Sequence, residues 1–154
     1  MIEIKAPNDF TSHLLSSRPS IFLAGSIEMG MAEDWQKKVV DGLKDVNCTI
    51  LNPRRDDWDP TWVQSKDNPK FREQVEWELN GIESANALFF YFDPNTKSPI
   101  TLMELGLVAA SNHQFCYVCC PEGFWRKGNV DMVCERNDIM MFESLDAAIE
   151  YIKG

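Results

Sequence analysis

The chain has 154 residues, of which 24 are acidic and 15 are basic, so its formal charge at neutral pH is −9. This length favours one compact domain over residues 1–154 that needs neither a disulfide nor a metal ion for stability. The acidic balance repels phosphate backbones and argues against binding of a nucleic-acid polymer. No run of about 18 apolar residues could span a membrane, and the N-terminus lacks the order of a signal peptide, so we expect a cytoplasmic protein.

Apolar runs of strand length alternate with helical patterns, which is typical of a parallel sheet covered by helices on both faces. The first apolar run, residues 21–25, is continuous and ends in glycine, as expected for a buried strand. A helix is expected after it, where Trp35, Val39 and Leu43 recur at four-residue spacing. The next short strand is expected over residues 48–51.

The segment between Pro53 and Asn68 is longer than the roughly four to six residues of most connections. It carries Trp58 and Trp62 among several charged side chains. Two interpretations stay open for it. The segment either covers a substrate as a lid or is a solvated loop packed by its own tryptophans.

Asn68 and Pro69 predict the start of a second helix, as N-cap and first helical residue. Its apolar stripe is expected at Phe71, Val75, Leu79 and Ile82. The longest apolar run of the chain, residues 87–92, follows this helix and is the expected central strand. Its carboxyl end is where open α/β sheets place their ligands.

The remaining sequence continues the alternation. The expected elements are a helix from Ser98 to about Asn112, a strand over 115–120, a helix from Asn129 to about Arg136, a strand over 139–142 and a helix after Ser144. Five strands and five helices in strict alternation predict a doubly wound α/β fold.

The five cysteines are odd in number, and three of them fall in one apolar run. No second pair of cysteines or histidines has the spacing of a metal site. We therefore interpret Cys116 and Cys119 as core thiols on a strand and expect neither a metal ion nor another cofactor.

Glu104 is the most unusual residue of the sequence, because it is the only formally charged residue from Ser98 through Pro121. Its helix is apolar on all sides, and such a helix is expected to be buried. Burial of a carboxylate without partners is costly, so Glu104 predicts a partner, a ligand or a chemical role. A glutamate that merely reaches solvent is the alternative. Because Glu104 lies within two turns of the helix start, the helix dipole is expected to keep it ionised, as a nucleophile requires.

Two further carboxylates are candidates for an acid that works with Glu104. Glu78 lies beside the apolar stripe of the second helix, and Asp93 follows the central strand. Either could protonate a leaving group while Glu104 attacks, as in the carboxylate pairs that cleave glycosides. The alternatives are a Glu78 that reaches water and an Asp93 that forms a turn.

The loop after the first strand, residues 25–31, has the glycine spacing of a phosphate loop without its chemistry. Lysine and serine or threonine should follow Gly30, and Glu28 would repel a triphosphate. ATPase and standard dinucleotide-binding functions are therefore disfavoured. What remains is a turn of small residues, Gly25 and Ser26, that lets the backbone approach a ligand closely.

Five segments, in this order and spacing, resemble the nucleoside 2-deoxyribosyltransferase family. They are residues 21–26, 52–55, 77–86, 98–106 and 123–130. The resemblance implies a three-layer fold of the flavodoxin-like or Rossmann-like kind with about five parallel strands. It also implies transfer of a 2-deoxyribosyl group between nucleobases through a covalent intermediate on the glutamate of the Glu-Leu-Gly motif, which is Glu104. Such a reaction belongs to nucleotide salvage.

The resemblance further implies which residues form the site. An acidic residue against the base falls on Glu78, and the acid after the central strand falls on Asp93. Substrate contacts are expected from Gly25, Ser26, Arg54, Ser98 and Asn129. In the family a neighbouring subunit completes the sugar site, which falls on Asn129 and implies a homo-oligomer, a dimer or larger, with shared active sites.

Other outcomes of the same resemblance stay open. The chain could instead hydrolyse 2′-deoxynucleoside 5′-monophosphates, or it could be a non-catalytic module that binds nucleotides. In each case the partner is a small nucleoside or nucleotide, with a free nucleobase in the transfer reaction. The aromatic residues Phe124 and Trp125 are expected at a subunit contact rather than in the core.

Overall fold

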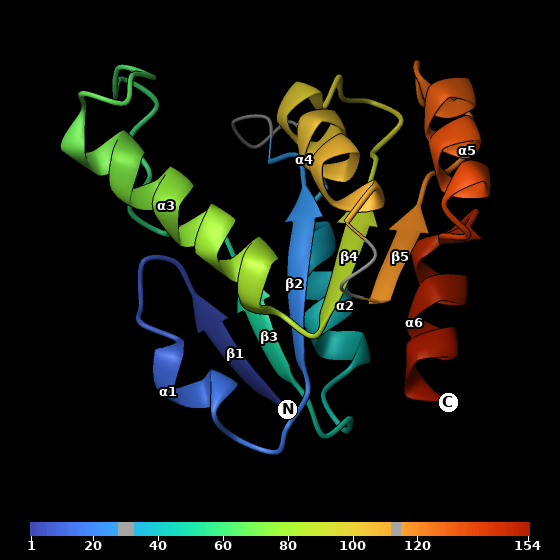
Figure 1. The fold of residues 1–154 in the computed structure, drawn as a ribbon, viewed down its shortest axis with the longest axis horizontal. Coiled ribbons are helices and arrows are strands. Elements are labelled where there is room, and N and C mark those ends of the chain that lie inside the picture. Colours follow the sequence, from blue (N-terminus) through green and yellow to red (C-terminus); the bar gives the residue numbers. More distant parts are fainter. Residues whose placement is uncertain (28–32, 112–114) are drawn as a thin grey trace.

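The computed structural model describes residues 1–27, 33–111 and 115–154. Within these ranges one parallel sheet lies between two layers of helices (Figure 1). The six strands are ordered β1-β3-β2-β4-β5-β6, and all neighbouring strands are parallel. The predicted three-layer, doubly wound α/β fold is confirmed.

The elements follow one another along the chain largely as predicted. The described strands are β1 (Ile2–Lys5), β2 (Ser20–Gly25), β3 (Thr49–Asn52), β4 (Ala87–Tyr91), β5 (Phe115–Cys119) and β6 (Met140–Phe142). The described helices are α1 (Thr11–Leu14), α2 (Trp35–Gly42), α3 (Pro69–Ser84), α4 (Pro99–Ala109), α5 (Lys127–Arg136) and α6 (Leu145–Lys153). The predicted end of the α4 segment at Asn112 lies outside the described residues.

β1 adds a sixth strand at the edge of the sheet, where the sequence predicted about five. It pairs with β3, placing Ile2 opposite Thr49 and Lys5 opposite Asn52. Within β1, Ile4 is the buried side chain, so this short segment lacks the continuous apolar run of the central strands. Backbone pairing holds such an edge strand, and its sequence carries little hydrophobic signal.

Apolar side chains fill the space on both faces of the sheet. α3, α4 and α5 cover one face, where Ile82, Leu105 and Val130 pack into the same cluster as Phe22 and Phe90 (Figure 1). α2 and α6 cover the opposite face. The cluster on that face includes Leu23, Trp35, Phe89 and Ile149. β2 and β4 are therefore buried on both sides, as their continuous apolar runs predicted.

The chain changes direction across the sheet between β2 and β4. From β2 it passes through α2 to β3 on one side, and then through α3 to β4 on the other side of β2. β2 and β4 end together, with Gly25 opposite Tyr91. In open α/β sheets the carboxyl ends of two strands at such a switch point leave a crevice in which ligands bind.

The buried face of α3 is rotated from the predicted stripe. Leu79, a predicted stripe residue, is 38% exposed. The buried residues of the helix are Gln74, Trp77, Gly81 and Ile82. Gly81 lets the helix approach β2 closely, since a Cβ there would lie 2.6 Å from the ring of Phe22. Because Glu78 lies one turn from both Gln74 and Ile82, the rotation turns it inward.

α4 covers the sheet with one face, and its outer face is exposed. Ile100, Met103 and Leu107 on that outer face are 57%, 64% and 58% exposed. The prediction that this apolar helix is buried on all sides is therefore wrong, because no described residue covers its outer face. No helix in the described ranges is long and apolar enough to cross a membrane.

Two predictions for the start of α5 are also wrong. The N-cap of α5 is Arg126, so Asn129 lies inside the first turn. Phe124 is 3% exposed and packs against Phe92, with ring centroids 5.0 Å apart, so it belongs to the core. Trp125, in contrast, is 46% exposed.

Candidate active site

Glu104 lies in the second turn of α4, on the side that faces the sheet. Its side chain is 8% exposed, and Thr101 and Leu105 beside it are also buried. No described residue donates a hydrogen bond to its carboxylate. Burial, together with the negative charge of Glu78, raises the pKa of Glu104 to about 8.

Glu78 lies on α3 and is the charged residue that acts on Glu104. Its side chain is half-buried. Its Oε1 accepts a hydrogen bond of 2.8 Å from Nε2 of Gln74. Burial raises the pKa of Glu78, and the hydrogen bond from Gln74 opposes that rise. The two carboxyls, from two helices, are thus close enough for their charges to interact, and we refer to them as the carboxyl pair.

The predicted ionised state of Glu104 is wrong for the free protein at neutral pH. The dipole of a helix acts mainly within its first turn, and Glu104 lies in the second turn of α4. Burial and repulsion from Glu78 outweigh that small effect, since both disfavour the charged form. Two carboxyls that interact this way titrate as a pair, and the raised pKa of Glu104 favours its protonated form near neutral pH.

Asp93 follows β4 at the switch point and is 3% exposed. Its Oδ1 accepts a hydrogen bond of 2.8 Å from the backbone N–H of Asn95, and its Oδ2 accepts one of 3.3 Å from that of Glu33. These bonds join the loop after β4 to the segment before α2. The structure does not couple Asp93 to Glu104 as it couples Glu78, because Glu78 is the charge that shifts the pKa of Glu104.

Gly25 and Ser26 end β2 beside Trp35 of α2. A Cβ on Gly25 would collide with the Trp35 ring and lie 2.9 Å from the carbonyl oxygen of Tyr91, so packing alone requires glycine there. The carbonyl of Ser26 accepts a hydrogen bond of 3.2 Å from the Trp35 indole. Residues 28–32, which include Glu28 and Gly30, lie outside the described residues.

Arg54 stands just beyond the carboxyl end of β3. Its Nη1 lies 3.3 Å from Oδ1 of Asp34, the N-cap of α2, and 3.5 Å from Oε1 of Gln36. The Arg54 side chain is 27% exposed. The guanidinium is therefore held beside the start of α2 with part of its surface open to solvent.

Ser98 precedes α4 in a left-handed backbone conformation, with φ 48°. It is 1% exposed, and its Oγ lies 2.7 Å from Oγ1 of Thr96. The Thr96 hydroxyl also donates to the carbonyl of Asp93. The loop that leads from β4 into α4 is therefore built by its own polar contacts.

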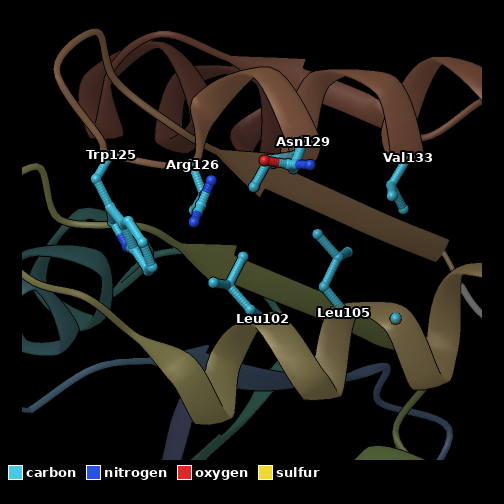
Figure 2. A pocket seen from close by; sticks show the side chains of 8 residues that line it. Leu102, Leu105, Trp125, Arg126, Asn129 and Val133 are labelled. Carbon is cyan, nitrogen blue, oxygen red and sulfur yellow. The ribbon is translucent and has the colours of Figure 1, made fainter.

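A cavity of about 340 Å³ lies between α4 and α5 (Figure 2). It is lined by Leu102, Leu105, Gly106, Trp125, Arg126, Asn129, Val130 and Val133. Figure 2 shows Asn129 on α5 facing this space from above, with Leu102 and Leu105 on α4 below. Leu102 and Gly106 lie two residues from Glu104, about 200° around the helix. The cavity and the carboxylate are therefore on different sides of α4, and Asn129 lies near the cavity rather than near the carboxyl pair of its own chain.

The segment between β3 and α3 packs on itself. The rings of Trp58 and Trp62 meet edge to face, 5.0 Å apart, and the guanidinium of Arg55 lies 5.4 Å from the centroid of the Trp62 ring. Arg55 is buried and forms ion pairs with Asp57 and Glu73. These contacts favour the loop packed by its own tryptophans over a lid.

The cysteines are free thiols, and burial governs their chemistry. Cys119, Cys120 and Cys134 are buried, and Cys116 is half-buried. Burial raises the pKa of all four to about 12, so they are protonated at neutral pH. This is the behaviour of the predicted core thiols.

The sequence interpretation missed Gln74, the polar neighbour of Glu78. Gln74 lies one turn before Glu78 and is 5% exposed. The signal was a glutamine four residues before a candidate acid, a spacing that places both on one face of a helix. It was hidden because the apolar stripe of α3 was expected at other positions.

Three comparisons with known proteins bear on the site. A family model described as nucleoside 2-deoxyribosyltransferase like matches residues 18–124, a range that includes Glu78, Asp93 and Glu104. The crystal structure of a conserved protein from Enterococcus faecalis V583 is similar in fold, with a TM-score of 0.63 and 12% sequence identity over 89% of this chain and 98% of that chain. No curated protein matches the chain.

Proposed function

The chain belongs to the nucleoside 2-deoxyribosyltransferase-like family, and on this premise we propose that it transfers the 2-deoxyribosyl group of a nucleoside between nucleobases. The observation that carries the proposal is the carboxyl pair, in which Glu104 is buried, accepts no hydrogen bond from the described residues, and has a pKa raised by burial and by Glu78. Cleavage of an N-glycosidic bond needs a nucleophile and an acid near each other. When the pair holds one proton, its carboxylate and its carboxylic acid supply the two roles.

In the first half of the reaction Glu104 is ionised and Glu78 carries the shared proton. An oxygen of Glu104 attacks C1′ of the deoxyribosyl group, and the bond from C1′ to the base nitrogen breaks. The departing base takes the proton of Glu78. The product is a deoxyribosyl ester of Glu104, and negative charge beside C1′ stabilises the oxocarbenium character of the transition state.

In the second half an incoming base attacks C1′ of the ester. The bond to Glu104 breaks, and the proton that the incoming base loses returns to Glu78. Two inversions at C1′ give net retention, as in two-carboxylate glycosidases. Water can replace the incoming base, so the same pair supports N-glycoside hydrolysis, including that of 2′-deoxynucleoside 5′-monophosphates. Neither half requires a metal ion or another cofactor.

The remaining predicted site residues form the surroundings of the substrate in this proposal. They are Gly25, Ser26, Arg54, Asp93 and Ser98. Four of these five lie around the switch point where open α/β sheets bind ligands, because Gly25 ends β2, Ser26 follows it, Asp93 comes shortly after β4 and Ser98 precedes α4. Arg54 follows β3, and its partly open guanidinium suits a substrate that carries a 5′-phosphate.

We also propose that the chain forms a homo-oligomer. Ile100, Met103 and Leu107 expose apolar surface along one helix face, which is a feature of protein contact sites. Asn129 lies on the neighbouring helix, away from the carboxyl pair of its own chain. A second subunit packed on this side would receive Asn129 at its sugar site.

The test is to incubate the purified protein with a 2′-deoxynucleoside, with and without a second free base, and to separate the products by chromatography. Formation of a new nucleoside supports transfer, and release of the base alone supports hydrolysis. Glu104→Ala should abolish both, while Glu83→Gln, which changes an exposed glutamate of α3, should not. Binding of the nucleoside without any product, or full activity of Glu104→Ala, would contradict the proposal.

A further inference from the structure

Gln74 is a buried glutamine whose amide nitrogen joins two acceptors. It is 5% exposed and lies one turn before Glu78 on α3. Its Nε2 donates one hydrogen bond of 2.8 Å to the carbonyl oxygen of Pro53 and another of 2.8 Å to Oε1 of Glu78. Both hydrogens of the amide are thereby used.

The orientation of this amide is decided by Pro53. A backbone carbonyl only accepts hydrogen bonds, so the nitrogen of Gln74 and not its oxygen has to face Pro53. Oε1 of Gln74 is then buried, and no described residue donates a hydrogen bond to it. An unpartnered buried oxygen is costly, and its presence indicates that the contacts of the nitrogen outweigh that cost.

The fixed amide makes the two oxygens of Glu78 unequal. A protonated carboxyl accepts a hydrogen bond better at its carbonyl oxygen than at its hydroxyl oxygen, and Gln74 donates to Oε1. A proton on Glu78 is therefore favoured on Oε2. No described residue donates a hydrogen bond to Oε2, so this oxygen keeps its capacity to exchange a proton.

The same amide makes the two carboxyls of the pair unequal. A hydrogen bond from a donor favours the ionised form of a carboxyl. Glu78 accepts such a bond, and Glu104 accepts none from the described residues. Glu104 on α4 is the charged group coupled to Glu78, and no charged side chain from the strands or from the loop before α3 shifts the pKa of Glu78.

We propose that Gln74, anchored on Pro53, is the positioning residue of the carboxyl pair. It holds Glu78 ionised and the shared proton on Glu104 in the free protein, and it directs the proton to Oε2 of Glu78 when the pair becomes active. The transfer is balanced, because Glu104 loses one proton, Glu78 gains it and the charge of the pair is unchanged. Its catalytic consequence rests on the proposed function, whereas the placement of the proton in the free protein does not.

The first experiment uses the unaltered protein. The side-chain amide resonances of Gln74 are followed by NMR as the pH is changed, together with the carboxyl carbons of Glu78 and Glu104. The Gln74 amide should titrate with Glu78, and Glu78 should ionise at lower pH than Glu104. An amide that does not respond to pH, or ionisation of Glu104 before Glu78, would overturn the proposal.

The second experiment replaces the amide by a side chain of similar size, in Gln74→Met. Loss of the hydrogen bond should raise the titration midpoint of Glu78 by roughly one pH unit, the effect of one donor on a charged group. Gln36→Met, which removes another fully buried glutamine, on the opposite face of the sheet, should leave that midpoint unchanged. An unmoved Glu78 midpoint in a folded Gln74→Met would overturn the proposal.

Activity adds a readout that a merely structural residue would not change. The acidic limb of the profile of kcat/KM against pH should move to higher pH in Gln74→Met, because the pair then stays doubly protonated to higher pH. A lower rate with an unmoved limb would contradict the positioning role. If the unaltered protein neither exchanges nor releases bases, the proposed function fails, and the titrations of the free protein still decide the role of Gln74.

Discussion

Replacing Glu104 by glutamine is expected to stabilise the protein at alkaline pH, although it removes the proposed nucleophile. In the folded protein the ionised carboxylate of Glu104 has little water around it and faces the charge of Glu78. Glutamine has nearly the same shape and cannot ionise. Glu104→Gln therefore removes the cost of a buried charge without leaving a large cavity.

The magnitude follows from the pKa of Glu104, which burial and then Glu78 raise from 4.5 to about 8. The unfolded chain loses this proton near the lower value. Between these two pKa values the folded state binds more protons, so the free energy of unfolding falls as the pH rises through this window. At about 1.4 kcal/mol for each pH unit, the loss above about pH 8 approaches an upper limit of about 5 kcal/mol.

Urea denaturation of the parent protein, Glu104→Gln and the control Glu83→Gln would measure this effect at several pH values from about 5 to about 9. The gain of Glu104→Gln over the parent should grow with pH, and the control should follow the parent. The relevant quantity is the slope of this stability gain against pH, because any cost of burying the new amide does not change with pH. Even half of the upper limit of about 5 kcal/mol would exceed the uncertainty of a free energy of unfolding extrapolated to zero urea. Parallel curves for the parent and Glu104→Gln would refute the burial argument.

Three other substitutions test separate parts of the structure. Glu78→Gln should lower the pKa of Glu104, which carbon NMR would show, and should reduce base exchange by roughly 10²- to 10⁴-fold, as expected for loss of a general acid. An unaltered exchange rate would move the acid role to Asp93. Gly81→Ala places a Cβ 2.6 Å from a ring of β2 and should reduce the free energy of unfolding by roughly 1–3 kcal/mol in urea; an unchanged midpoint would show that α3 does not need its close approach. Leu107→Glu on the exposed face of α4 should lower the sedimentation coefficient of the oligomer, and identical sedimentation would exclude this face from the subunit contact.

The α/β alternation of the sequence predicted the fold because the central strands carry their own signal. The runs around β2 and β4 are apolar on both faces, which only a sheet covered on both sides can satisfy. The caps at Asn68 and Ser144 also behave as predicted, since both side chains accept hydrogen bonds from the first turn of their helices. β1 was missed because an edge strand with one buried side chain resembles a loop in sequence.

The candidate site was predictable in part. Glu104 could be singled out because a lone charge in an apolar helix has few structural explanations, and the structure does bury it. Its protonation state could not be read the same way, since it depends on Glu78, a residue of another helix. Gln74 was missed because the rotation of α3 is set by the contact of Gly81 with β2, which no periodicity of α3 alone reveals.

Local preferences along the chain were enough to determine the order of strands and helices, the doubly wound sheet and one carboxylate that needed an explanation. Only the packing of α3 and α4 on the sheet decided which carboxyl raises the pKa of Glu104 and which apolar side chains stay exposed. The physical reason is that strand and helix signals are carried by neighbours in sequence. Burial, charge repulsion and hydrogen-bond donation depend instead on side chains that meet only when separate elements are folded together.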